Sequence, residues 1–151
     1  MKRVLHHALL LMLTLSATTA FSQNPTGKPS QFNNLPRQVN CSETEFERAL
    51  SAPKGQTVSL AFSDNFVFTG EVISNIVKYG TLQTILVKSP AYNNSLFSIS
   101  RIINGDRSIK YVGRIINKKY ADGFELKQDA SGAYQLVKVQ TDKVMPDCSH
   151  Q

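Results

Sequence analysis

The sequence predicts a mainly β domain, a small antiparallel meander that forms a barrel or a two-layer sandwich, with one short N-terminal helix. From Thr57 to Val139, β-branched and aromatic residues recur in short runs separated by turn residues. The connections are short and no helix of crossover length interrupts them, which favours antiparallel pairing. The tight-turn sequence Asn104-Gly105-Asp106 separates two such runs and predicts a hairpin.

Seven strands follow from these runs. Val58, Leu60 and Phe62 alternate with the small residues Ser59, Ala61 and Ser63, as in a strand with one buried face. Gly70 lies inside the second run and predicts a bulge or sharp bend there. The expected strands are Thr57–Ser63, Phe66–Tyr79, Leu82–Lys88, Ser95–Ile103, Arg107–Ile116, Phe124–Lys127 and Tyr134–Val139.

A helix is predicted before the first of these strands. Ser42 opens Ser-Glu-Thr-Glu, in which the serine side chain is expected to accept from the backbone of Glu45 while that glutamate reaches back. The helix then runs from about Glu43 to Leu50, and Pro53 with Gly55 follows it. Residues 23–40 are rich in Pro, Asn and Gln, which predicts a flexible leader.

The first 22 residues have the pattern of an export signal. Lys2 and Arg3 precede an apolar run at 8–15, and small residues follow at 16–20. Cleavage after Ala20 or after Ser22 satisfies the small-residue rule, and the second is preferred. The apolar run is shorter than the roughly 20 residues that span a bilayer. We therefore expect a secreted or periplasmic protein.

The exported part is expected to hold one domain, residues 41–148, closed by a disulfide between Cys41 and Cys148. These are the only two cysteines of the chain, and an oxidising compartment lets them pair. A loop of about 100 residues closed in this way is stabilised by about 4 to 5 kcal/mol in the chain-entropy model. Two unrelated buried thiols are the alternative.

The chain offers few residues that could support histidine-based or metal-based catalysis. His6 and His7 leave with the signal, and His150 is the penultimate residue of the chain. A Ser–His–acid or Cys–His site needs an oriented base, and zinc needs three or four ligands, so we expect no cofactor and no metal. A carboxylate-dependent hydrolase is a lower alternative, and its candidate acids are Glu71, Asp122 and Glu125.

Positive charge is the remaining signal. Six basic residues fall within one short stretch of the chain, and Asp106 is the only acid among them. The cluster consists of Arg101, Arg107, Lys110, Arg114, Lys118 and Lys119. Alternation along Arg107–Ile116 places Lys110 and Arg114 on the face opposite Tyr111 and Ile115. Such a row is either a solvated outer face or a docking patch for an acidic partner.

These observations favour a secreted, non-enzymatic interaction module that binds a protein or other acidic surface partner through a sheet face or edge. The alternative is a small β-barrel that carries an apolar ligand in its interior. The removal of Lys2 and Arg3 lowers the 17 basic residues to 15 against 11 acidic ones, about +4. This mild excess does not indicate specific nucleic-acid binding.

Overall fold

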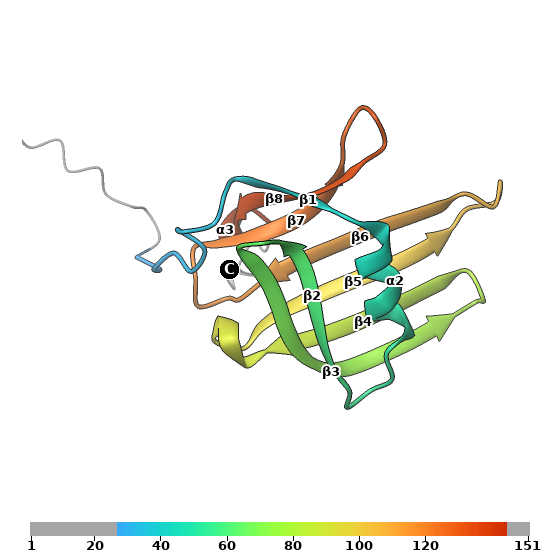
Figure 1. Cartoon of the computed structure of the whole chain (residues 1–151), viewed down its shortest axis with the longest axis horizontal. Coiled ribbons are helices and arrows are strands. Elements are labelled where there is room, and N and C mark those ends of the chain that lie inside the picture. The colour runs from blue at the N-terminus through green and yellow to red at the C-terminus, as the bar shows by residue number, and fades with distance from the viewer. Residues whose placement is uncertain (1–26, 145–151) are drawn as a thin grey trace, which may run out of the picture.

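The computed structural model describes residues 27–144, which form eight antiparallel strands in a nearly closed, barrel-like sheet (Figure 1). The strands are β1 Gln38–Cys41, β2 Thr57–Ser63, β3 Phe66–Lys78, β4 Leu82–Ser89, β5 Ser95–Ile103, β6 Ile109–Ile116, β7 Asp122–Gln128 and β8 Tyr134–Gln140. Their order is β1-β8-β7-β6-β5-β4-β3-β2, so β2 to β8 are a meander. The predicted signal peptide, Cys148 and His150 lie outside the described residues.

The sheet confirms the mainly β, antiparallel prediction and decides for a barrel-like closure over a two-layer sandwich. β5 and β6 are joined by the predicted tight turn, with Ile103 opposite Ile109 in register. The eighth strand is β1, which pairs with β8 from Gln38 opposite Val137 to Cys41 opposite Tyr134. The first and last strands of the described chain are therefore neighbours.

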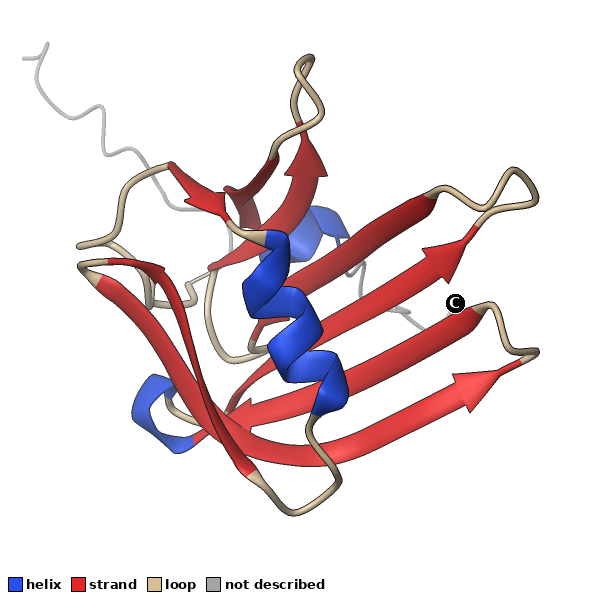
Figure 2. Cartoon of the chain, turned by 45° about the vertical axis from the view of Figure 1, so that its right-hand side comes forward, coloured by secondary structure: helices blue, strands red, loops and turns tan. Residues whose placement is uncertain are grey.

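Helix α2 (Glu43–Ser51) occupies the expected residues but does not open the fold, because β1 precedes it. It lies across the sheet (Figure 2) and buries Phe46, Ala49 and Leu50. A single turn, η1 (Pro90–Tyr92), links β4 and β5, and a second short helix, α3 (Thr141–Val144), lies at the C-terminal end.

The N-cap of α2 differs from the predicted reciprocal arrangement. The Ser42 hydroxyl accepts from the backbone N–H of Thr44 at 3.2 Å, and the N–H of Glu45 donates to the Ser42 carbonyl instead. The Glu45 side chain accepts from the backbone N–H of Ala61 on β2 at 2.8 Å. β2 is an edge strand of the sheet, so the Ala61 N–H could pair with a further strand. The Glu45 carboxylate occupies this N–H instead.

Residues 27–40 are not a free leader in the structure, in contrast to the prediction. Phe32 is 1% exposed and packs edge-on against Phe124, and Val39 is 3% exposed. Lys138 donates to the carbonyls of Phe32 and Leu35 at 2.7 and 2.8 Å. The two buried side chains and the hydrogen bonds from Lys138 of β8 hold this segment against the barrel.

Aromatic rings fill the barrel interior. Phe66 contacts Phe32, Phe62, Tyr92 and Phe124 with ring centroids 5.3 to 6.2 Å apart. A second group lies under α2, where Phe46, Tyr111 and Tyr134 meet. The remaining buried large apolar side chains come from alternate positions of the strands and include Leu60, Ile85, Ile99, Ile115 and Leu136.

The bend predicted at Gly70 is present in modified form. The pairing register of β3 with β4 shifts between Val72 and Ser74, two residues further on. At Gly70 itself a Cβ would lie 2.5 Å from the carbonyl oxygen of Lys88. The glycine is therefore required by the close approach of β4, and the bulge beside it lets β3 coil.

Candidate binding surface

The outer face of β3–β6 has apolar side chains interspersed with polar and basic ones. One register row across it contains Ile76, Thr84, Ser100 and Val112, and the row toward the hairpin tips contains Lys78, Leu82, Ile102 and Lys110. Ile76 is 49% exposed and Val112 38%. An antiparallel sheet with one wet face normally alternates apolar and polar residues. β4 and β5 instead have apolar side chains on both faces.

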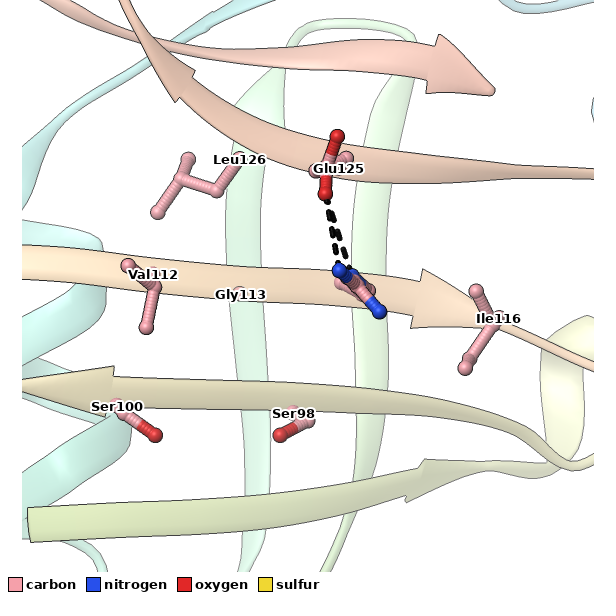
Figure 3. A pocket seen from close by; sticks show the side chains of 8 residues that line it. Ser98, Ser100, Val112, Gly113, Ile116, Glu125 and Leu126 are labelled. Carbon is pink, nitrogen blue, oxygen red and sulfur yellow. Dashed lines mark hydrogen bonds and ion pairs between the residues drawn. The ribbon is translucent and has the colours of Figure 1, made fainter. Parts of the chain in front are cut away.

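A groove of about 470 Å³ crosses this face beside β7 (Figure 3). It exists because β6 and β7 are in register at only two positions, Arg114 with Glu125 and Ile115 with Phe124, and diverge beyond them. Small side chains at Ser98 and Ser100 deepen it. The groove is lined by Ser98, Ser100, Val112, Gly113, Arg114, Ile116, Glu125 and Leu126.

Arg114 and Glu125 form the charged wall of the groove. The Arg114 Nη2 lies 3.2 Å from Oε1 of Glu125, and Lys127 Nζ lies 3.4 Å from the other carboxylate oxygen. Arg114 also donates to the carbonyl of Val144 at 3.4 Å. With side-chain exposures of 46% and 24%, the Arg114–Glu125 pair is screened by solvent and adds little to stability. Two cations face one carboxylate here, which leaves the wall positive.

The six basic residues singled out in the sequence do not form one patch. Lys110 and Arg114 project from the outer face of β6, opposite the buried Tyr111 and Ile115. Arg107 lies in the β5–β6 turn. Lys118 and Lys119 lie in the loop after β6, so this strand, roughly 25 Å long, separates them from Arg107.

Arg101 lies on the inner side and holds α2. Its guanidinium donates to Glu47 Oε2 at 3.1 Å and to Gln83 Oε1 at 3.0 Å. The Tyr111 hydroxyl also donates to Glu47. Burial, followed by the Glu47 hydrogen bond and charge, raises the pKa of Tyr111. Gln83 and Asn75 donate their side-chain amides to the Leu50 carbonyl at the end of the helix. This hydrogen-bond network holds α2 on the sheet, and Arg101 is part of it.

The three candidate catalytic carboxylates lie apart. Asp122, 7% exposed, accepts the backbone N–H groups of Gln31 and Phe32 at 2.6 and 3.0 Å, so it anchors the N-terminal segment. Glu125 is occupied by Arg114 and Lys127. Glu71 is exposed on β3, where it lies opposite Thr57 and Lys88. Within residues 27–144, no group of three His, Cys, Asp or Glu residues is placed to hold a metal.

Cys41 is half-buried at the end of β1, where its Sγ lies 3.4 Å from the Val39 carbonyl oxygen. Burial raises the pKa of its thiol to about 11. Its predicted partner, Cys148, is outside the described residues, and the disulfide stays a prediction.

Comparison of this chain with protein-family models, with curated proteins and with solved structures finds no match. No helix among residues 27–144 has the length and apolarity to cross a bilayer. The arguments about function therefore rest on the chemistry of this surface.

The apolar outer face was missed in the sequence, although a signal for it exists. In β4, Leu82 and Leu86 occupy one face while Ile85 and Val87 occupy the core face. Apolar residues at positions of both parities in a strand of an antiparallel meander are the sequence signal for an outer face that is partly apolar.

Proposed function

We propose that this chain is an exported, non-enzymatic binding module that takes an extended acidic segment of a partner protein on the outer face of β3–β6. The groove beside Arg114 carries the proposal, because it combines an apolar floor, two serine hydroxyls and a positive wall. Hydroxyls and apolar side chains suit a peptide backbone with alternate apolar side chains. Lys110, Arg114 and Lys127 favour acidic residues at its rim.

The alternative, an apolar ligand carried inside the barrel, has less support. The rings of Phe32, Phe62, Phe66 and Phe124 pack against one another where such a ligand would lie. Native mass spectrometry of the protein from its own source tests this alternative, since a stoichiometric small ligand would favour the carrier over the surface binder. A carboxylate-dependent hydrolase has weaker support still, because Asp122 is engaged by two backbone donors.

A binding titration tests the proposal. The probe is a capped peptide of alternating glutamate and valine, titrated into the mature protein and followed by NMR. We expect shifts at Ser98, Ser100 and Val112, and a dissociation constant that rises at least about fivefold in the Lys110→Gln/Arg114→Gln variant at low salt. This difference should shrink as salt rises, because screening removes the same attraction.

The matched control is Lys118→Gln/Lys119→Gln, which makes the same change in net charge at the far end of β6. It should leave the affinity close to that of the wild type. Equal affinities of the wild type and the Lys110→Gln/Arg114→Gln variant at low salt would overturn the proposal. Arg101 is left out of the test because its replacement disturbs the hydrogen-bond network that holds α2 on the sheet.

A further inference from the structure

A second surface lies at the end of the barrel where two hairpins project past α2 (Figures 1 and 2). One is the β3–β4 hairpin with its turn at Tyr79-Gly80, and the other is the β5–β6 hairpin with its turn at 104–108. The N–H of Ile103 donates to the carbonyl of Thr81 at 2.8 Å, which ties one tip to the other. The two tips therefore present one joint surface.

Apolar side chains are exposed on this surface. Tyr79 is 90% exposed, Val77 62% and Ile109 51%. These are the three most exposed large apolar side chains among residues 27–144. Scattered exposed residues are normal, but a concentration of them at one end of a molecule marks an interaction site.

The backbone at Tyr79 adds an independent observation. Tyr79 and Gly80 have φ angles of +56° and +69°, and the N–H of Thr81 donates to the Lys78 carbonyl, as in a β-turn with both central residues left-handed. Asn, Asp or Gly is preferred at the first position of this turn. An aromatic residue is strained there, and it gains no burial in return.

The charge at this end is positive. Lys78, Arg107 and Lys110 are exposed on these two hairpins, and Asp106 is the one acid of their turns. Lys78 and Lys110 share a register row on the outer face, whereas Val77 and Ile109 lie on the inner face. The Asp106 carboxylate accepts both the N–H and the hydroxyl of Ser108, at 2.9 and 2.7 Å. These hydrogen bonds lower the pKa of Asp106 but commit it to the turn. An anionic partner surface is complementary to this arrangement.

We propose that the paired hairpin tips dock this protein on an anionic lipid bilayer, with Tyr79, Val77 and Ile109 entering the interface. The tips project, and a projecting apolar surface suits a medium that deforms around it, whereas a protein partner needs a matching cavity. Tyrosine is favoured at headgroup level, and lysine and arginine are drawn to anionic lipids. This site lies toward the hairpin tips, and Lys110 lies between it and the groove beside Arg114.

The absence of tryptophan from the chain allows a single-site reporter. The Tyr79→Trp variant of the mature protein is mixed with phosphatidylcholine vesicles that contain or lack phosphatidylglycerol. We expect a blue-shifted emission and quenching by brominated acyl chains only with the anionic vesicles. Tyr120→Trp, in the loop after β6, is the matched reporter at the other end of the strand and should not respond.

Substitutions then separate the two contributions. Lys78→Gln and Lys110→Gln should each weaken cosedimentation with anionic vesicles about fivefold, and Lys119→Gln should not. Val77→Thr keeps the side-chain shape and should weaken binding, whereas Val67→Thr makes the same change at the other end of β3 and should not. Tyr79→Asn should weaken binding without loss of fold, because asparagine tolerates this backbone.

An unresponsive Tyr79→Trp reporter with anionic vesicles would overturn the proposal. So would quenching that is equal at Tyr79→Trp and Tyr120→Trp. Binding that follows charge alone, unaffected by Val77→Thr and Tyr79→Asn, would also refute insertion. None of these outcomes bears on the peptide titration, so the two proposals fail or succeed separately.

Discussion

The backbone N–H of Tyr111 donates to the phenolic oxygen of Tyr134 at 3.0 Å, at a point where β6 has already parted from β7. A side chain thus takes the place of a strand partner in the buried opening between β6 and β7. The Tyr134 ring contributes as well, since it packs edge-on against Phe46 and Tyr111.

Tyr134→Phe should lower the free energy of unfolding by about 1 to 3 kcal/mol, because it keeps the ring and leaves a buried N–H without a partner. Urea denaturation measures the change, and hydrogen exchange at the Tyr111 amide should become faster. Tyr79→Phe removes a hydroxyl from a 90% exposed ring and should change stability by less than about 0.5 kcal/mol. A Tyr134→Phe protein as stable as the wild type would show that the Tyr111 amide finds another acceptor.

Asp122→Ala should cost about 2 to 4 kcal/mol, since the two N–H groups of Gln31 and Phe32 lose a charged acceptor. Trypsin cleavage after Arg37 should become faster because the 27–37 segment is no longer anchored. Glu71→Ala, at an exposed carboxylate, is the control for both measurements. Unchanged cleavage at Arg37 would indicate that Lys138 alone holds the segment.

Gly123→Ala should destabilise the fold by about 1 to 3 kcal/mol. An added Cβ would lie 2.5 Å from the Ile115 carbonyl oxygen, at the position where β6 and β7 are joined. Gly105→Ala makes the same substitution where nothing lies within 4 Å and should be neutral in thermal unfolding. Similar melting temperatures for the two variants would mean that β7 shifts at little cost.

In the reduced protein, the Cys41 thiol should react slowly with iodoacetamide, because its pKa of about 11 leaves about a hundredfold less thiolate near pH 8 than an ordinary value of 9 does. The folded state retains a proton that the unfolded state releases. The stability from this group is therefore present below pH 9 and lost as pH rises toward 11. Alkylation rates measured across pH 8 to 12 give the thiol pKa.

The Cys41–Cys148 disulfide needs a separate measurement, since a buried thiol and a bonded one both resist alkylation in the native state. Alkylation of the unreduced protein in denaturant, followed by intact mass, distinguishes them. We expect no alkylation and a mass two hydrogens below that of the reduced protein, and Cys41→Ser should lower the melting temperature. Two alkylated cysteines under these conditions would disprove the bond.

The parts of the fold predicted from the sequence are those set by local patterns. Alternation placed Tyr111 and Ile115 inward and Lys110 and Arg114 outward, and the turn sequence placed the β5–β6 hairpin. Phe32 was missed because its partners are remote: Lys138 is 106 residues away in the chain. Arg101 looked like a free surface charge for the same reason, since Glu47 lies on α2, 54 residues earlier.

The adjacency of β1 and β8 sets a time order for folding as the chain is synthesised. β1 and Phe32 emerge early, yet their partners on β8 are among the last described residues to be made. The β2–β6 hairpins form from neighbours in sequence, while closure awaits a contact across nearly the whole domain and bears the largest loop entropy. Until then Phe32 and the edge of β8 are uncovered, and this interval is when the chain is most exposed to aggregation.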